Sequence, residues 1–289
     1  MTDLDQGTLG SLRQTARSKQ ATTLRSRLVR CMGVFVLVLC VISCDEEKRV
    51  AEQEVTPSRA HDEPLRVHWD YMGIEGPEHW GLLSEAYMTC EAGDRQSPIN
   101  IETTQKPQSQ QTIKFQYAPT RIFEVNNGHT IQVSHESGCK ADLNGRPYRL
   151  RQFHFHDPSE HHIDGKTFPM EMHLVHQDAG GQILVVAVLM ETGSNEPVLT
   201  KLWDWLPDQI EREVSLPLKT NIGVILPENP QFYSYSGSLT TPPCTEGVKW
   251  IVLKEPIAIA KQDVEKFVEI IGYSARPVQP VGDRQINES

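Results

Sequence analysis

Two short segments of this 289-residue chain alternate histidine with large apolar residues, and this pattern limits how the chain can fold. The first segment, residues 152–156, reads Gln-Phe-His-Phe-His. Successive side chains of an extended strand point to opposite faces of a sheet, so Gln152, His154 and His156 share one face. The pattern predicts a strand that holds two imidazoles within reach of one metal ion.

The second segment begins at Glu171 and reads Glu-Met-His-Leu-Val-His, which places Glu171, His173 and Val175 on one face. His173 can therefore supply a third nitrogen to an ion bound by His154 and His156. A zinc site with three histidines keeps its fourth position open for water, which distinguishes a catalytic site from a closed structural one. We expect these three histidines to bind a catalytic Zn²⁺.

Each histidine ligand needs a hydrogen-bond partner for its other ring nitrogen, and Gln152 and Glu171 are placed for this role on the same strands. An isolated His-x-His pattern indicates metal only weakly. The chain has 11 histidines, however, and six of them lie between His154 and His176. This clustering strengthens the metal interpretation.

The remaining pattern favours a mainly β fold. Several segments alternate apolar and polar residues or have the composition of buried strands, and 19 Gly with 19 Pro supply many turns. No repeat or linker-like break divides the chain after its N-terminal region, so we expect one domain over residues 65–289. The predicted strands are residues 130–135, 148–156, 170–176, 183–190 and 248–253, and the predicted helices are residues 197–206 and 261–271.

Residues 1–44 have the pattern of an export signal. An uncharged, largely apolar run, residues 31–44, follows three arginines and precedes three acidic residues, and it is shorter than the about 20 residues of a membrane-spanning helix. The run ends in Val41-Ile42-Ser43-Cys44, which is similar to a bacterial lipobox. We expect Cys44 to be acylated and to begin the mature chain, with residues 45–64 as a polar tether. A plain signal peptide and a short membrane anchor are the alternatives.

Residues 45–289 hold 22 basic and 36 acidic side chains, a formal charge of −14. Nucleic-acid phosphates repel such a chain, so we expect no nucleic-acid partner.

Export also bears on the cysteines, because disulfides persist in oxidising compartments. Three cysteines follow the tether, and the odd number leaves one of them unpaired, although sequence alone does not say which: Cys90, Cys139 or Cys244.

The histidine segments belong to a set of motifs that closely resembles the alpha-class carbonic anhydrases. The resemblance runs from about Val67 to Ile286 in the same order throughout. The further motifs are Gly76-Pro77-Glu78-His79-Trp80, Arg95-Gln96-Ser97-Pro98-Ile99, Asn126-Asn127-Gly128-His129, Ser159-Glu160-His161, Ser238-Leu239-Thr240-Thr241-Pro242-Pro243 and Trp250-Ile251-Val252-Leu253.

This resemblance implies a large, twisted, mostly antiparallel sheet with a few short peripheral helices and zinc at the bottom of a cone-shaped cavity. It implies a lyase that reversibly hydrates carbon dioxide to bicarbonate and a proton by zinc-bound hydroxide, with slow ester hydrolysis as a side activity. The short loop after His156 and the positions of two cysteines resemble bacterial members. That similarity implies a Cys90–Cys244 disulfide and leaves Cys139 unpaired, which we expect to be a buried, inert thiol.

The resemblance also assigns roles to individual residues. Thr240 and Glu160 would orient the hydroxide. His129 would shuttle protons to solvent, a role that suits the ordinary histidine pKa of about 6.5. The implied carbon dioxide site comprises Val175, Val185, Leu239, Thr240, Thr241 and Trp250, and the implied cavity lining comprises Tyr71, Asn127 and Gln132.

Two other functions compete with this interpretation. A binding module could keep the fold and the metal without turnover, but noncatalytic relatives typically lack one of the three ligand histidines, and this chain has all three. A zinc esterase could use the same site, whereas the absence of a His-Glu-x-x-His motif gives no support to peptidase chemistry. We expect a periplasmic or cell-surface protein held at a membrane by lipid, and the sequence leaves its oligomeric state open, a dimer included.

Overall fold

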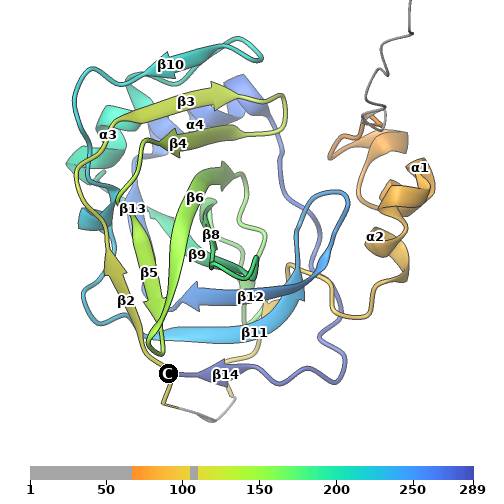
Figure 1. Ribbon diagram of the computed structural model, residues 1–289. Helices are drawn as coiled ribbons and strands as arrows, with labels where there is room; N and C mark the ends of the chain where they lie inside the picture. Colours follow the sequence, from red (N-terminus) through yellow and green to blue (C-terminus); the bar gives the residue numbers. More distant parts are fainter. Residues whose placement is uncertain (1–66, 105–109) are drawn as a thin grey trace, which may run out of the picture. The chain divides into compact units, whose positions relative to one another are not determined.

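The computed structural model describes residues 67–104 and 110–289 (Figure 1). The predicted export signal, Cys44 and the polar tether lie outside these residues. Strands dominate the described part, which contains a 12-stranded sheet and a separate 2-stranded sheet. The fold is mainly β, as predicted. No helix of the described ranges is long and apolar enough to cross a membrane.

The main path of the large sheet has the order β10-β3-β4-β6-β8-β9-β12-β11-β14; in addition, β5 pairs with β2 and β6, and β13 pairs with β9. Most neighbours are antiparallel, but β12 and β13 both run parallel to β9. The strands are β1 Asn100–Ile101, β2 Ile113–Gln116, β3 Ile122–Asn126, β4 Ile131–His135, β5 Lys140–Leu143, β6 Arg146–His156, β7 His162–Ile163, β8 Met170–Gln177, β9 Ile183–Thr192, β10 Glu213–Ser215, β11 Phe232–Ser238, β12 Glu246–Leu253, β13 Ile257–Ile259 and β14 Asn287–Glu288.

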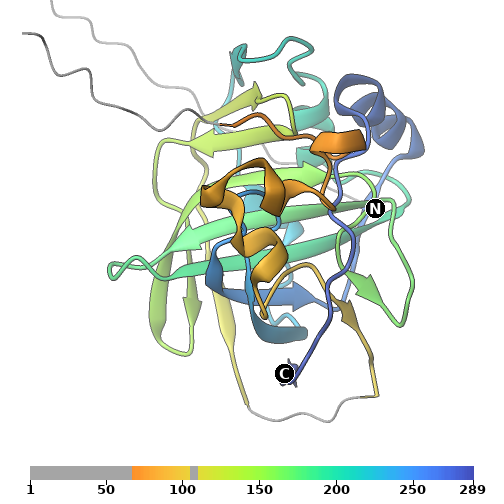
Figure 2. The same ribbon diagram turned by 90° about the vertical axis from the view of Figure 1, so that its right-hand side faces the viewer.

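Helices are short in the described part of the chain. They are α1 Trp80–Leu83, α2 Thr89–Ala92, α3 Pro197–Trp203 and α4 Lys261–Ile271, with the 3-10 turns η1 Gly73–Glu75, η2 Glu85–Tyr87 and η3 Ile222–Ile225. Figures 1 and 2 show α1 and α2 in orange at the side of the sheet, next to the loop that joins β11 to β12.

The five predicted strands correspond to β4, β6, β8, β9 and β12, and the second predicted helix corresponds to α4. The first predicted helix is too long by three residues, because α3 ends at Trp203. The Trp205 N–H bonds to the carbonyl of Leu202 in a tighter turn. Pro207 then disfavours a helical conformation of the residue before it, which ends the helix early.

Apolar side chains fill both faces of the sheet. On one face, Phe155 of β6 packs edge-on against Trp203 of α3 and Phe267 of α4, with ring centroids 4.8 and 6.4 Å away. On the other face, Val185 of β9 and Trp250 of β12 belong to a second buried cluster. The large sheet is therefore buried on both sides, and its strands can carry apolar residues at consecutive positions.

A bulge interrupts the alternation within β6. Leu150 pairs with His176 and Gln152 pairs with Val175, so Arg151 is an extra residue in the ladder. Leu150 and Phe153 accordingly both point into the core on the α3 and α4 face, although they are three residues apart.

One carboxyl group is buried in this core without a partner. Glu124 of β3 is fully buried, and neither of its oxygens has a hydrogen-bond partner among the described residues. Its neighbours across the sheet are Val133 and Val214. Burial raises the pKa of Glu124 to about 8, although the ammonium group of Lys266 partly opposes the rise.

We predict that Glu124 makes stability fall as the pH rises. The carboxyl binds its proton more tightly in the folded chain than in the unfolded chain. Its contribution to the free energy of unfolding is therefore complete below pH 4.5 and is lost as the pH rises through about 8. The free energy of unfolding of the parent, measured in urea, should therefore fall by an amount on the order of 4 kcal/mol between pH 5 and pH 9. Glu124→Gln should not show this fall. Glu213→Gln is the control, because that side chain is exposed on the adjacent strand. Parallel pH profiles of Glu124→Gln and the parent would contradict the prediction.

Candidate metal centre

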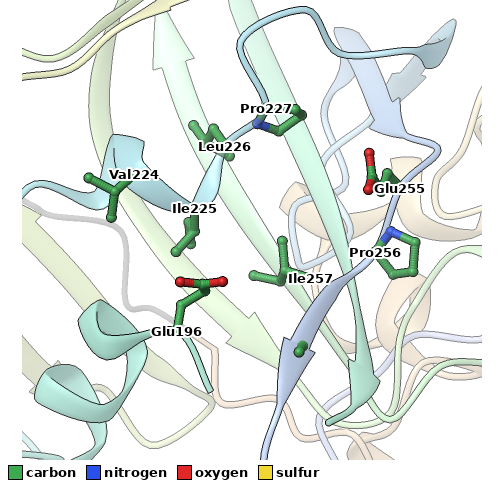
Figure 3. Close-up of a pocket in the computed structure, with 9 residues that line it drawn as sticks. Glu196, Val224, Ile225, Leu226, Pro227, Glu255, Pro256 and Ile257 are labelled. Atoms are coloured by element: carbon green, nitrogen blue, oxygen red, sulfur yellow. The ribbon is translucent and has the colours of Figure 1, made fainter. Parts of the chain in front are cut away.

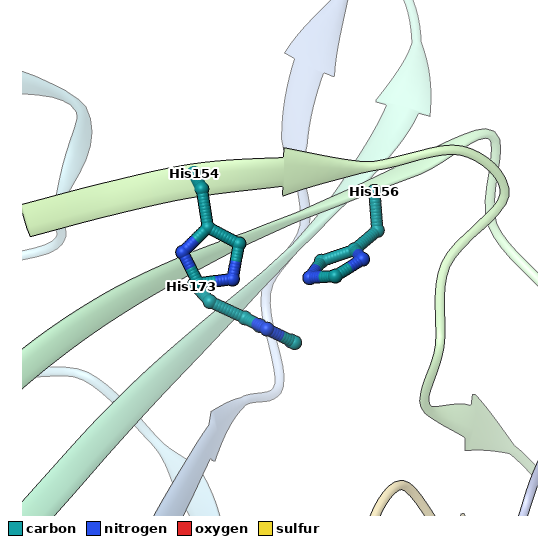
Figure 4. Close-up of side chains that lie close together, drawn as sticks. All are labelled: His154, His156 and His173. Carbon is teal, nitrogen blue, oxygen red and sulfur yellow. The ribbon is translucent and has the colours of Figure 1, made fainter. Parts of the chain in front are cut away.

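Three histidines from two adjacent strands come together on one face of the sheet (Figure 4). His154 and His156 lie two residues apart on β6, and His173 lies directly opposite His154 on the antiparallel strand β8. Their ring centroids are 4.5–5.3 Å apart. One nitrogen of each ring lies within 4.8 Å of the others. These are the three residues that the alternating pattern predicts as metal ligands.

Two of these histidines are oriented by residues of their own strands. His154 Nδ1 lies 2.8 Å from Gln152 Oε1, and His173 Nε2 lies 2.7 Å from Glu171 Oε1. Amide and carboxylate oxygens only accept hydrogen bonds, so these nitrogens donate and the opposite nitrogen of each neutral ring keeps its lone pair. His154 Nε2 and His173 Nδ1 are therefore available to a metal.

His156 has a partner that the sequence pattern does not identify. Its Nδ1 donates to the backbone carbonyl of Ser274, 2.6 Å away and far along the chain. Its Nε2 is buried and has no hydrogen-bond partner among the described residues. An unpaired buried nitrogen is costly, and a metal ion would satisfy it. Three imidazole nitrogens at one point are a donor set that fits Zn²⁺.

Burial keeps the three rings neutral. Desolvation lowers the pKa of His156 to about 4, lowers that of His173 below the usual histidine value, and lowers that of His154 well below it. Around His154, the other two imidazoles add to the effect. Only the neutral form of histidine offers a lone pair, so these surroundings suit metal binding at neutral pH.

Glu171 also orients a second buried histidine. Its carboxylate accepts from the backbone N–H and from Nδ1 of His161, each at 2.7 Å. His161 Nε2 lies 2.7 Å from the Tyr235 hydroxyl, which lies 2.8 Å from Ser97 Oγ. Burial alone would raise the pKa of Glu171, but His161 and His173 hold it well below its usual value. Glu171 is thus ionised near neutral pH and orients two imidazoles.

Glu160 lies next to the histidines and is 1% exposed. Its Oε1 accepts from the backbone N–H of Arg276 at 2.8 Å. Its Oε2 lies 3.6 Å from His156 Nε2 and 3.8 Å from His173 Nδ1. Burial raises the pKa of Glu160 to about 7, while His173, the Arg276 N–H and the nearby Thr240 hydroxyl oppose the rise.

A disulfide and a buried arginine fix the surroundings of Thr240 and Glu160. Cys90 of α2 and Cys244, which follows β11, form a disulfide across 154 residues of chain. The guanidinium of Arg276 donates to the carbonyl of Cys90 at 2.8 Å, while the backbone of the same residue holds Glu160. Sequence reasoning missed Arg276, because its contacts join segments that are far apart in the chain.

Apolar side chains border the three histidines on one side. The indole of Trp250 lies 4.9 Å from the His173 ring, between centroids, and its N–H donates to the Ser238 carbonyl. Val175 follows His173 by two residues on β8. The remaining predicted wall residues are Val185, which pairs with Val175, the half-buried Leu239 and Thr241, and the buried Thr240.

His129 lies in the turn before β4, outside the three-histidine cluster. Its ring stacks on the Trp69 indole with centroids 3.8 Å apart, and its Nε2 donates to the Trp69 carbonyl at 2.9 Å. The carbonyl only accepts, so Nδ1 is the free nitrogen of the neutral ring. Asn127 Oδ1 accepts from the backbone N–H groups of His129 and Thr130 and thereby shapes this turn.

The other two predicted cavity residues have different surroundings. Gln132 of β4 pairs with His154 across the sheet. Tyr71 is buried and packs edge-on against Trp69 and Trp80. Burial raises the pKa of the Tyr71 hydroxyl well above its usual value, and the nearby Glu160 adds to the rise.

A separate hollow of about 280 Å³ lies between η3 and β13 (Figure 3). Its lining is mostly aliphatic, with Ile225 and Ile257 beside the carboxylates of Glu196 and Glu255. Its lining offers two carboxylates but no histidine, cysteine or hydroxyl side chain, and none of the three-donor clusters found among the described residues lies in it.

Comparison with known proteins points to one family. Residues 75–289 match the family model described as eukaryotic-type carbonic anhydrase. Carbonic anhydrases of Neisseria gonorrhoeae and Klebsiella pneumoniae are 45% and 43% identical to this chain; the matches cover 77% and 76% of this chain and 88% and 91% of those relatives. The structure of the alpha-carbonic anhydrase from Thermovibrio ammonificans with the inhibitor sulfanilamide aligns with a TM-score of 0.74 at 42% identity, over 76% of this chain and 99% of that chain.

We predict that the disulfide stabilises the fold substantially. Cys244→Ser should lower the free energy of unfolding by about 2–5 kcal/mol, because the crosslink closes a long loop and limits the unfolded chain. Urea denaturation under oxidising conditions measures the difference. A reductant should destabilise the parent to the same extent and leave Cys244→Ser unchanged. A parent and variant of equal stability would show that the crosslink contributes nothing.

Proposed function

The chain belongs to the eukaryotic-type carbonic anhydrase family, and from this we propose that it hydrates carbon dioxide with Zn²⁺ bound by His154, His156 and His173. Membership of the family implies reversible carbon dioxide hydration. The zinc assignment is carried by one observation: three neutral imidazoles converge, those of His156 and His173 buried and that of His154 half-buried, and the buried Nε2 of His156 has no hydrogen-bond partner in the described chain. Zinc held there would supply Lewis-acid activation of water, the role for which carbonic anhydrases are the standard example.

Thr240 and Glu160 would position the attacking oxygen. We expect the Thr240 hydroxyl to accept a hydrogen bond from this nucleophile and to donate its own to Glu160. The contacts of Glu160 support this role, because the Arg276 N–H favours the ionised form that accepts. Positive charge at the histidine cluster would favour that form further, since Oε2 of Glu160 lies 3.6 Å from His156 Nε2.

The apolar wall beside the histidines would hold carbon dioxide. The substrate is apolar and offers few polar groups, so aliphatic and aromatic surfaces suit it better than hydrogen-bond donors. Trp250 and Val185 support this assignment, since both are buried in the cluster that borders His173. Val175, Leu239, Thr240 and Thr241 would complete the substrate site.

His129 would carry protons between the cavity and solvent. Hydration releases one proton in every cycle, and histidine exchanges protons near neutral pH with little bias. The half-buried ring is fixed by its stack on Trp69, and its free Nδ1 supports proton exchange. Tyr71, Asn127 and Gln132 would organise water between His129 and the histidine cluster.

We extend the proposal to the location of the protein. A disulfide is compatible with export, because disulfides persist in oxidising compartments. Residues 1–44 would be the export signal, Cys44 the acylated residue, and residues 45–64 the tether of the catalytic domain that follows. Cys139 is a buried free thiol within the described part of the chain, and burial raises its pKa, which reduces its reactivity.

Two other activities define what an assay must separate. A binding module would hold zinc without turnover, and an esterase would hydrolyse an ester faster than carbon dioxide. Stopped-flow hydration with and without a chelator, followed by an ester assay on the same sample, distinguishes a carbonic anhydrase from a binding module and from an esterase. Chelator-sensitive hydration as the fastest reaction is the expected result.

We predict that His173→Ala abolishes zinc binding and hydration. Loss of one of three ligands leaves the imidazoles of β6 without their partner across the sheet, and zinc affinity should fall by more than about 100-fold. Metal analysis after dialysis and stopped-flow hydration measure the effect. His79→Ala, an exposed histidine, is the control. Stoichiometric zinc and full activity in His173→Ala would refute the assignment.

We predict that His129→Ala slows turnover without loss of zinc. In weak buffer the maximal rate should fall by about 10- to 100-fold, because proton transfer to bulk water replaces the histidine. Zinc content and kcat/KM should change little, and added imidazole should restore the rate. Equal turnover of variant and parent in weak buffer would remove His129 from the mechanism.

A further inference from the structure

A second hollow, of about 500 Å³, lies between the end of β4, the loop that follows it, and strands β5 and β6. We call it the basic pocket, defined by Lys140, Arg149 and Arg151, which all line it. These three side chains are exposed, and none of them belongs to the three-histidine cluster. Nothing in the proposed carbon dioxide chemistry uses them.

Two of these cations lie side by side on adjacent strands. Lys140 of β5 pairs directly with Arg149 of β6. Side chains of directly paired residues point to the same face, about 4.5–5.5 Å apart at Cβ, and like charges in this position repel. The bulge at Arg151 brings a third cation to the same face, because Leu150 and Phe153 both turn into the core. The fold therefore concentrates like charge at one point.

Acidic side chains of the described chain do not neutralise the positive charge of the basic pocket. None of the three cations forms an ion pair within residues 67–104 and 110–289. Glu136 is the acidic residue that lines the pocket, and it lies 3.8 Å from the guanidinium of Arg121 instead. Arg151 donates to the neutral amide of Gln177 at 2.9 Å. Such a pocket is unusual in a chain with a formal charge of −10.

We propose that the basic pocket binds a small oxyanion. Guanidinium groups present paired N–H donors that match two oxygens of one anion, and a lysine adds a point charge. An anion between Lys140 and Arg149 would convert their repulsion into two charge-assisted hydrogen bonds. Hydrogen phosphate and bicarbonate share this chemistry, and bicarbonate is the product of the proposed reaction. The pocket is a site separate from the metal centre.

Calorimetric titration of the full-length chain with inorganic phosphate at constant ionic strength tests the proposal. The double variant Lys140→Gln/Arg149→Gln should raise the dissociation constant by about tenfold or more, because two charged donors are lost. Lys219→Gln is the control for the loss of surface charge as such, since it removes an exposed positive charge outside the pocket. Phosphate should also raise the thermal midpoint of the parent more than that of the double variant.

A second titration with bicarbonate identifies the source of the anion. Displacement of phosphate by bicarbonate in the parent would identify the product as a ligand, and binding of phosphate alone would assign the pocket to another oxyanion. His173→Ala should bind phosphate as the parent does. The proposal is wrong if the double variant keeps the parental affinity, if Lys219→Gln weakens binding equally, or if His173→Ala alone abolishes it. The initial rate of hydration by the double variant, in buffer without phosphate or added bicarbonate, should equal that of the parent, so the proposal can fail independently of the carbon dioxide assignment.

Discussion

The pairing of β6 with β8 is the constraint on which the rest of the site depends. His154 lies opposite His173 in this ladder, and the pleat puts His156 on the same face. A slip of one residue would turn His173 into the core beside α3 and α4 and bring Met172 or Leu174 to the site, because side chains alternate between faces. Both of these neighbours are fully buried in that core. Burial of the apolar residues therefore fixes the register that assembles the imidazoles.

Two buried carboxyl groups beside the histidines have opposite electrostatic character. Glu171 accepts from two imidazoles and one backbone N–H, and these contacts outweigh the cost of burial, so its pKa is held low. Glu160 has one backbone donor and weaker neighbours, and burial raises its pKa to about 7. Glu171 therefore keeps its charge and its geometry near neutral pH, whereas Glu160 responds to charge that arrives at the site.

Sequence pattern predicts those parts of the site that lie two residues apart on one strand. Gln152 and Glu171 follow from the same alternation as the histidines that they orient. Ser274, which accepts from His156, contributes a backbone carbonyl, and no residue pattern indicates such a contact. Short strands such as β2 and β10 escape prediction for a similar reason, since three or four residues carry too little periodicity and form only against a partner already in place.

The bulge at Arg151 shows how one inserted residue affects both the core and the charge on the opposite face of the sheet. Tyr148 and Leu150 lie in the same core as Phe153 and Phe155, so the apolar residues before and after the bulge are out of phase by one position. A regular strand could not bury all four. With the bulge, Arg149 and Arg151 lie on the face that carries Gln152 and His154 farther along β6. The core thus requires an irregularity in β6, and this irregularity places a concentration of positive charge on the strand that supplies two of the three histidines.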